Sequence, residues 1–503
     1  MLEVTDVAVW YPTSGIALAP TSCVVEEGGI VLVAGRNGSG TTSLLRSLAH
    51  DLPPGARRVG QIRLDGADLA DAHPDDLVGE VALVADAVAL PSARVADVVS
   101  PGRARSAVTD EVIERLGLVE SLNQRLAAAT ASVQLRARLA AALAERPRLL
   151  LVDQPLAPLE SRWRGPVAAL LRDCADQGTV VVWADHEWDS ALTVADHVLE
   201  LGVPDVGAGC SEPVQAWQWR PSTGPMTPTQ QVVAELGLTG PGCTTPAGLR
   251  RRLQPLLRHG RPSPRPRVRP RAQQLVQLDE ERTVVVDQGA LTQFWCPTAE
   301  QARTLGRQLG AAPRASTDTG TTVARACRAH DTRTGLAGGS SEQVVSQHLP
   351  EVRPDDLVAH HSRGEQAQLW AVLALAGGAN ALVDPSRHLD QAMRQQLRAF
   401  CRDGLGHQDG PTLADSTLWV TTDVDDLVWA DRVIVTDQGQ FVADGRPSAV
   451  LGHLPQLPTL AAACRPHPLV HPDDIVDVAS SVDGASSVDG ASRVDVASAG
   501  GLP

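Results

Sequence analysis

Nine residues from Gly35 to Ser43, with the sequence GRNGSGTTS, have the types and the spacing that bind phosphate. They follow an apolar run at 30–33 that predicts a strand, and they precede a segment, LLRSLA, that predicts a helix. Glycines let backbone N–H groups converge on phosphate oxygens through dihedral angles that a Cβ would forbid. The following helix adds its positive N-terminal end. The candidate phosphate-binding residues are Gly35, Asn37, Gly38, Ser39, Gly40, Thr41, Thr42 and Ser43.

One position of this loop departs from the phosphate-loop pattern. Thr41 stands where G-x-x-x-x-G-K-[ST] has lysine, and threonine is neutral and too short to reach the β- and γ-phosphates. Thr42 keeps the hydroxyl that holds Mg²⁺ in this pattern. Lysine is absent from the whole chain, whose 44 basic residues are all arginine, so a drift in composition is a second explanation for its loss. We expect a loop that has the phosphate-binding shape without its charge.

Two further polar residues follow apolar runs that predict buried strands. Asp153 closes the run Leu149–Val152, and His186 follows the run Val180–Trp183 by way of Asp185. Strands that alternate with helical segments predict a mostly parallel α/β sheet, in which function lies at the carboxyl ends of the strands. Asp153 at such an end is expected to hold Mg²⁺ through water, and His186 to approach the γ-phosphate.

Composition limits the classes of function. A length of 503 residues suggests two to four domains, and 43% hydrophobic residues suffice for real cores. A formal net charge of −15 argues against nucleic acid as a partner. The eight cysteines are scattered without a C-x-x-C pair, so we expect free thiols. We expect no signal peptide, and no apolar run is long enough to span a membrane, so any membrane role would require a partner.

The chain divides into four segments. We expect α/β domains at 1–205 and 275–452, the first with a small antiparallel sheet, a Pro/Arg-rich linker with short helices at 206–274, and a disordered tail at 453–503. Val383-Asp384 repeats the strand end Val152-Asp153, and Ala430–Val433 repeats Ala195–Val198, which indicates two copies of one unit. The basic run at 258–271 is expected to be solvated linker, with contact to acidic lipid or nucleic acid as the alternative.

These motifs, in this order, resemble the ATP-binding cassette (ABC) family as two fused ATP-binding units, similar in layout to the fused ATPases of energy-coupling-factor importers. The resemblance implies ATP and Mg²⁺ as ligands. It implies that Tyr11 stacks on adenine and that Gly35–Ser43 is the Walker A loop. Gln154 then stands in place of the catalytic glutamate, and His186 is the switch histidine. Three other family positions are altered in the first unit, namely Ala85 for the Q-loop glutamine, Ala129–Val133 for the signature, and Glu160 for the D-loop aspartate.

The second unit departs from the family in other places. Its signature, His361–Gln366, resembles L-S-R-G-E-Q and contributes Ser362, Gly364 and Gln366 to nucleotide binding by resemblance. Val383–Asp390 resembles the Walker B and D-loop sequence D-E-P-T-R-H-L-D with its glutamate deleted. The Walker A position, Cys296–Thr304, has no glycine and carries Glu300, and Thr422 replaces the switch histidine.

In this family each ATP lies between the Walker motifs of one unit and the signature of the other. Site one would join Gly35–Ser43, Asp153 and His186 to the second unit's signature. Site two would join Cys296–Thr304 to Ala129–Val133, and both of its faces have decayed. The resemblance therefore implies an intramolecular cassette dimer with one partly preserved site.

Two hypotheses of different classes follow. The first is an ATP-binding transporter subunit with weak or lost ATPase activity, cytoplasmic and held at the inner face of the cell membrane by integral membrane subunits. The second is a non-hydrolysing pseudo-ATPase that acts as a structural or regulatory scaffold. A cassette protein that acts on DNA or ribosomes is a third, disfavoured by the net charge.

Overall fold

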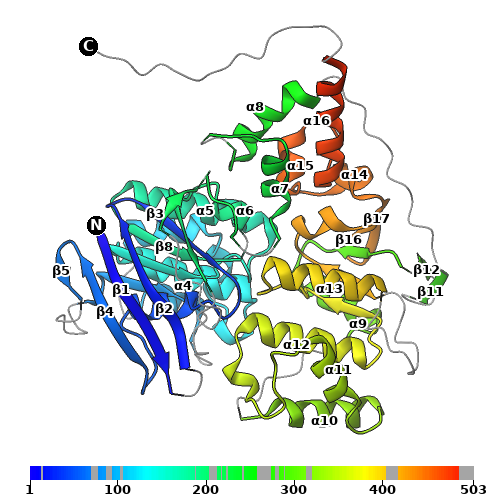
Figure 1. The fold of residues 1–503 in the computed structure, drawn as a ribbon, viewed down its shortest axis with the longest axis horizontal. Helices are drawn as coiled ribbons and strands as arrows, with labels where there is room; N and C mark the ends of the chain where they lie inside the picture. The colour runs from blue at the N-terminus through cyan, green and yellow to red at the C-terminus, as the bar shows by residue number, and fades with distance from the viewer. Residues whose placement is uncertain are drawn as a thin grey trace.

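The chain folds around two β-sheets rich in parallel strands, one in its first half (residues 1–202) and one in its second half (residues 283–454), with helices packed on them (Figure 1). The computed structural model describes residues 1–12, 15–69, 77–85, 93–101, 106–186, 188–202, 212–216, 218–222, 225–240, 243–257, 273–277, 283–287, 289–312, 320–403 and 417–486. The α/β class expected from the sequence is confirmed.

The first half contains two sheets. A four-stranded antiparallel sheet has the order β2-β1-β4-β5, which confirms the small antiparallel sheet expected near the N-terminus. A six-stranded sheet has the order β10-β9-β3-β8-β7-β6, and only β10 runs antiparallel to its neighbour. The strands are β1 (Leu2–Tyr11), β2 (Gly15–Val25), β3 (Ile30–Gly35), β4 (Arg57–Leu64), β5 (Ala67–Asp68), β6 (Val81–Val84), β7 (Leu149–Asp153), β8 (Val180–Ala184), β9 (His197–Leu201) and β10 (Val214–Gln215).

Helices cover both faces of this six-stranded sheet. They are α1 (Thr41–Leu48), α2 (Val95–Val99), α3 (Ala107–Arg115), α4 (Ala131–Ala144), α5 (Ser161–Asp176) and α6 (Trp188–Ala191), with 3-10 turns at η2 (Val119–Ser121) and η3 (Leu126–Ala128). Successive side chains of a strand point to opposite faces. Leu150 and Val152 of β7 therefore pack with α4 and α5 in one core, while Leu149 and Leu151 pack toward α1 and the antiparallel sheet in another.

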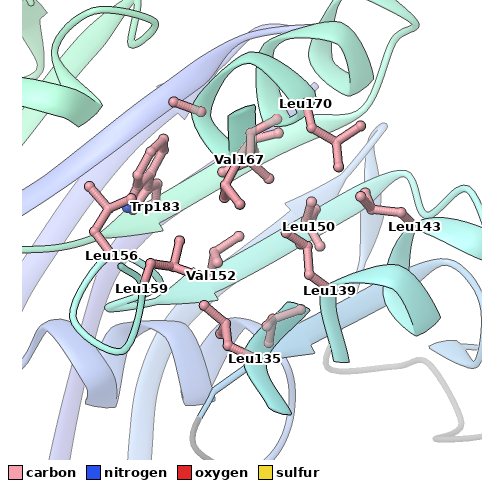
Figure 2. Close-up of a cluster of buried hydrophobic side chains, with 14 of the residues drawn as sticks. Leu135, Leu139, Leu143, Leu150, Val152, Leu156, Leu159, Val167, Leu170 and Trp183 are labelled. Carbon is pink, nitrogen blue, oxygen red and sulfur yellow. The ribbon is translucent and has the colours of Figure 1, made fainter. Parts of the chain in front are cut away.

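The core beneath α4 and α5 fixes the strand that ends at Asp153. Figure 2 shows Leu135, Leu139 and Leu143 of α4 facing Leu150 and Val152 of β7, with Val167 and Leu170 of α5 and Trp183 of β8 beside them. Leu139, Leu150, Val152, Val167 and Trp183 are all 0% exposed. A strand buried on both faces reads as a continuous apolar run, which is why β7 and β8 were predictable from sequence.

The second half repeats the parallel part of this architecture. Its five-stranded sheet has the order β14-β15-β13-β16-β17, and a separate two-stranded antiparallel sheet pairs β11 with β12. The strands are β11 (Gln273–Gln277), β12 (Thr283–Asp287), β13 (Thr292–Trp295), β14 (Ala381–Val383), β15 (Leu418–Thr421), β16 (Arg432–Asp437) and β17 (Gln440–Gly445). The helices are α9 (Ala299–Gln308), α10 (Val323–Thr334), α11 (Ser340–His348), η5 (Val358–His360), α12 (Arg363–Ala376), α13 (Gln391–Asp403), η6 (Asp425–Trp429), α14 (Pro447–Val450) and η7 (Leu451–His453).

A pair of equivalent hydrogen bonds occurs in the two halves. Asp196, just before β9, accepts a bond from the backbone N–H of Ile30 at 2.8 Å. Asp431, just before β16, accepts one from Leu291 at the same distance. The strand next to each of these bonds also has equivalent neighbours in the two sheets. In the first half β3 lies between β8 and β9, and in the second half β13 lies between β15 and β16.

Four helices form a separate unit that includes part of the segment expected to be a disordered tail. Helices α7 (Pro228–Glu235) and α8 (Pro246–Leu257) pack with α15 (Thr459–Cys464) and α16 (Pro472–Ser486) around one apolar cluster (Figure 1). The prediction that residues 453–503 are disordered is therefore wrong as far as residue 486, because Ile475, Val478 and Ala479 bury one face of α16 in this cluster. The end of the tail and the basic run at 258–271 lie outside the described residues.

Candidate functional site

The loop between β3 and α1 has the conformation of a phosphate cradle. Gly38 and Gly40 have φ values of +84° and +93°, in the left-handed region that favours glycine. A Cβ on Gly40 would lie 2.3 Å from the carbonyl oxygen of Ala17, and one on Gly35 would lie 2.2 Å from the hydroxyl of Ser39. Gly38 is therefore favoured by its dihedral angle, Gly35 by lack of space, and Gly40 by both.

Inside the cradle, the Ser39 hydroxyl is buried and has no hydrogen-bond partner within the part of the chain that the structure describes. A buried polar atom without a partner is uncommon in a folded protein. Ser39 lies in the turn that leads into α1, where backbone N–H groups and the positive end of the helix favour an anion. The loop therefore fits a phosphate in shape, although Thr41 brings no positive charge.

Two oxygen-bearing side chains that could hold Mg²⁺ meet beside the loop. The Thr42 hydroxyl donates to Oδ2 of Asp153 at 2.9 Å, which joins the first turn of α1 to the end of β7. Hydroxyl and carboxylate oxygens are the ligands that Mg²⁺ prefers, usually with several waters retained. Thr42 and Asp153 thus fit the predicted metal position.

Tyr11 reaches the same helix from the antiparallel sheet. Its hydroxyl lies 3.1 Å from Oγ of Ser43, so the last residue of β1 is held against the second residue after Thr41. The structure therefore places Tyr11 next to the phosphate loop. Its stacking on adenine stays a prediction.

Gln154 and His186 meet at the carboxyl ends of β7 and β8. Nε2 of Gln154 lies 3.3 Å from Nε2 of His186. Gln154 has a φ of 48°, and its backbone N–H donates to the carbonyl oxygen of Ala184 at 2.7 Å. Burial lowers the pKa of His186, although Asp390 and Asp185 oppose this effect, so the ring is held neutral.

Asp185 anchors the turn that carries His186. Its carboxylate accepts bonds from the backbone N–H groups of His186, at 2.8 Å, and Leu156, at 3.1 Å, and from the indole of Trp183 at 3.1 Å. Burial raises the pKa of Asp185, and these three donors work against that shift. The carboxylate thus ties the strand end to the loop after Gln154.

Residues of the second half lie against the phosphate loop of the first. A Cβ on Gly364 would lie 1.9 Å from Nδ2 of Asn37, so the signature of the second half touches the phosphate loop of the first. Ser362 begins α12 with a capping box, in which its hydroxyl accepts from Glu365 N–H and the Glu365 carboxylate accepts from Ser362 N–H. Gln366 donates to the carbonyl oxygen of His361 at 2.8 Å, a contact within its own half.

Two contributions from the second half were not predicted. Oδ2 of Asp390 accepts from the backbone N–H of Asn37 at 3.1 Å, and Nδ1 of His388 lies 3.0 Å from Oε1 of Gln154. Both residues belong to the stretch Val383–Asp390 that resembles D-E-P-T-R-H-L-D, but the sequence alone predicts no role for its histidine. The sequence feature that could have indicated these roles is the D-loop-like stretch itself, because such a stretch faces the opposite half if the two halves pair.

The structure corrects the Walker B assignment in the second half. Val152 pairs with Trp183 in the first sheet, and Leu382 pairs with Trp419 at the same place in the second, so Val383 is the counterpart of Asp153. Asp384 is then the counterpart of Gln154, and both have left-handed backbones and donate to the neighbouring strand.

The glutamate is therefore replaced in the second half, not deleted. Val383 stands at the position that Asp153 has in the first half, and Asp384 stands at the position of the family's glutamate. Oδ1 of Asp384 accepts bonds from the backbone N–H and the hydroxyl of Thr422, at 2.9 and 3.2 Å, within the same half. Sequence alone assigns the metal-binding position to the first carboxylate after the apolar run, and the register of β14 shows that this assignment is one residue too late.

The opposite interface, site two, has no cradle in the described residues. The helix α9 begins at Ala299, with only three residues between it and β13, and the hydroxyl of Thr298 accepts from the N–H of Gln301 at its start. At the altered signature of the first half, the Ser132 hydroxyl donates to the Glu160 carboxylate at 2.8 Å. The polar groups at both positions thus bond within their own half.

An ion pair joins the halves at this second interface. Arg164 of α5 donates to both carboxylate oxygens of Asp423 at 3.0 and 2.9 Å, and the two side chains are 7% and 8% exposed. Burial would lower the pKa of Arg164, but Asp423 and Asp425 outweigh it and raise that pKa. Ser161 adds two bonds, donating to Thr422 O at 3.1 Å and accepting from Val424 N–H at 3.2 Å.

Comparisons with known proteins agree on one family. A sequence model of the ABC transporter family matches residues 18–157. The hemin import ATP-binding protein of Jannaschia sp. is 31% identical over 217 residues, which cover 40% of this chain and 78% of that protein. The manganese transport system ATP-binding protein of Synechocystis sp. is 26% identical over 42% of this chain and 85% of that protein. A solved ATP-binding subunit of an ABC transporter is 18% identical with a TM-score of 0.39, over 48% of this chain and 95% of that one.

Proposed function

This chain belongs to the family of ABC transporter ATP-binding proteins, and we propose that it binds MgATP at site one, between its two halves, and couples that binding to membrane subunits of a transporter. Site one consists of the phosphate loop, Thr42, Asp153, Gln154 and His186 from the first half, with the signature at Ser362 and Gly364 from the second. ATP turnover at this site is weak or lost.

The observation that carries this proposal is the contact of Gly364 with Asn37. A signature that touches the phosphate loop of the other half is what a composite nucleotide site requires, and only glycine fits at that approach. The hydrogen bond from Asn37 to Asp390 supports the same pairing. ATP binding therefore requires residues of both halves, and the two halves of one chain pair as two separate subunits would in a dimer.

Weak turnover follows from two side chains. Thr41 provides no positive charge to the phosphates, and Gln154 has no group that accepts a proton from an attacking water. Loss of a general base alone typically lowers a rate by about 10²–10⁴-fold. When it binds, Mg²⁺ would supply charge to the phosphates, and Thr42 and Asp153 would hold it.

The membrane role follows from family membership. ATP-binding subunits of ABC transporters work with membrane transporter subunits, and we propose that this chain lies at the cytoplasmic face of the membrane through integral membrane partners, as in energy-coupling-factor importers. Among the described helices, none combines the length and the apolar character needed to cross a bilayer.

A scaffold that does not hydrolyse ATP is the second candidate. The buried Arg164–Asp423 pair favours it, because this pair holds the two halves together at site two without any nucleotide. In this function the paired halves would serve as a fixed platform for partner proteins, and nucleotide at site one would stabilise the platform or be absent.

Titration calorimetry with ATP and Mg²⁺ tests the nucleotide site on which the transporter function depends. We expect weak binding that disappears when EDTA replaces Mg²⁺, and that Asp153→Ala abolishes because Thr42 and Asp153 hold the metal. Asp384→Ala is the matched control in the second half and should leave binding unchanged, since its carboxylate binds Thr422 in its own half. No heat and no thermal shift at millimolar ATP would leave only the scaffold.

A further inference from the structure

The Gln154 carboxamide lies between two imidazoles that come from different halves of the chain. Oε1 is 3.0 Å from Nδ1 of His388, and Nε2 is 3.3 Å from Nε2 of His186. An amide oxygen only accepts hydrogen bonds, and an amide nitrogen only donates them. Nδ1 of His388 must therefore donate, and Nε2 of His186 must accept. The three side chains thus form one directed chain across the interface.

Both ends of the contact between the halves have an uncommon backbone. Gln154 has a φ of 48° and His388 a φ of 69°, in the left-handed region that non-glycine residues rarely adopt. Such conformations persist where the surroundings determine them, and they gather at functional sites. The carbonyl of His388 also lies against Gly364, whose added Cβ would come within 2.7 Å of that oxygen. The signature and His388 therefore pack as one wall of site one.

The corresponding positions at site two do not form this chain. The counterpart of His388 in the first half is Pro158, which stands one residue before Leu159 as His388 stands before Leu389. Proline locks φ near −65° and carries no side-chain donor, so it can neither adopt the conformation nor make the bond. Asp384, the counterpart of Gln154, accepts instead from Thr422 of its own half. The contact between the halves through this position is specific to site one.

We propose that His388 is a positioning residue of site one, supplied by the second half, which holds the Gln154 carboxamide with its NH₂ edge turned toward His186 and the terminal phosphate. This inference rests on the proposed function, in which site one takes MgATP. A flipped amide would place its oxygen against phosphate oxygens, and two acceptors repel. With Oε1 occupied by His388, the amide presents donors to the anion, which is the favourable sense.

Three substitutions at one position separate the hydrogen bond from the backbone. His388→Ala removes the donor, His388→Gly removes the donor but keeps the left-handed backbone, and His388→Asn keeps both, because its Nδ2–H replaces Nδ1–H and asparagine tolerates this conformation. We expect MgATP binding by calorimetry to weaken about tenfold in the Ala and Gly variants, the value of one lost hydrogen bond, and to stay within about twofold in the Asn variant. Pro158→Ala is the matched control at site two and should leave binding unchanged.

A second measurement needs no nucleotide. Histidine-selective ¹⁵N NMR of the full chain reads the tautomer of His186, which should carry its proton on Nδ1 in the wild type and in His388→Asn, and lose that fixed state in His388→Ala. A wild type that shows this signature but binds no MgATP would refute the proposed function while the positioning role stands. An unchanged His186 signature in His388→Ala, or equal loss of binding in the Ala and Asn variants, would overturn the role of His388.

Discussion

At the scale of single residues, two substitutions decide what site one can do. In the proposed function, Thr41 brings no positively charged side chain to the phosphates, and Gln154 replaces a base by an amide that lies between His186 and His388. The rest of the phosphate loop keeps its shape, because Gly38 and Gly40 adopt left-handed conformations. Binding and hydrolysis thus depend on different residues of the same site.

We predict that hydrolysis returns only when both residues are restored. Thr41→Lys should tighten MgATP binding without much turnover, and Gln154→Glu alone should add little turnover because the phosphates stay poorly held. The double variant should hydrolyse ATP about 10²-fold or more above either single variant, the lower end of what a general base contributes. Phosphate release under single-turnover conditions measures the hydrolysis rate. A double variant whose rate is only the sum of the two low single-variant rates would contradict these roles.

Asp425 predicts the pH dependence of the interface at site two. Its side chain is 25% exposed, and burial together with the nearby Asp423 carboxylate raises its pKa from 3.8 to about 7, with Arg164 opposing. The folded state therefore binds more protons than the unfolded state between those values, so this group's contribution to stability is lost as pH rises through 7.

The measurement is the urea midpoint at pH 6 and pH 8 for the wild type and for Asp425→Asn. The amide mimics the neutral carboxyl and still accepts from Thr459, whose N–H donates to Asp425 at 2.6 Å. We expect the wild type to lose more stability between pH 6 and pH 8 than the variant does. An equal loss in both proteins would show that Asp425 does not titrate in this range.

At the scale of elements, the sequence predicted the buried strands and the loop between β3 and α1, because apolar runs and glycines express local physics. It did not predict the register of β14, since a strand end at Val383 and one at Asp384 look alike without the partner strand. It also missed the role of His388, whose contact depends on the opposite half. The sequence pattern thus could not predict contacts between residues that are distant in the chain.

The first turn of α12 gives a prediction for the packing of elements. Gly364→Ala places a Cβ 1.9 Å from Nδ2 of Asn37, which is too close, so the signature must move away from the phosphate loop. Overpacking of this kind costs about 1–3 kcal/mol, and we expect MgATP binding to weaken about tenfold or more. Gly338→Ala is the control, because a Cβ there meets nothing within 4 Å. Equal affinities for the two variants, measured by calorimetry, would mean that this contact does not limit binding.

At the scale of the whole molecule, the four-helix unit and the ion pair join the two halves on the side of site two. The Thr229 hydroxyl of α7 donates to Asp189 of the first half at 2.6 Å, while Thr459 of α15 donates to Asp425 of the second. Segments expected as linker and tail thus touch both halves. Their fold was not predictable because α7 and α8 bury their apolar faces against helices that come more than 200 residues later.

The Arg164–Asp423 pair should contribute strongly to this junction. Arg164→Met leaves Asp423 buried without its cation, and breaking a buried pair typically costs about 3–5 kcal/mol. Arg115→Met is the control, because it removes an ion pair with Asp173 whose partners are 36% and 48% exposed, and it should cost at most about 1 kcal/mol. Urea unfolding measures both, and Arg164→Met with Asp423→Leu should recover part of the loss. Equal costs for the two single variants would remove the pair from this account.

The central claim is that one chain carries one nucleotide site. Native mass spectrometry of the full chain at saturating MgATP counts bound nucleotides directly. We predict one nucleotide per chain in the wild type and in Asp384→Ala, and none in Asp153→Ala, because the site-one cradle and its metal oxygens come from the first half. Two nucleotides per chain, or one that survives Asp153→Ala, would contradict this account.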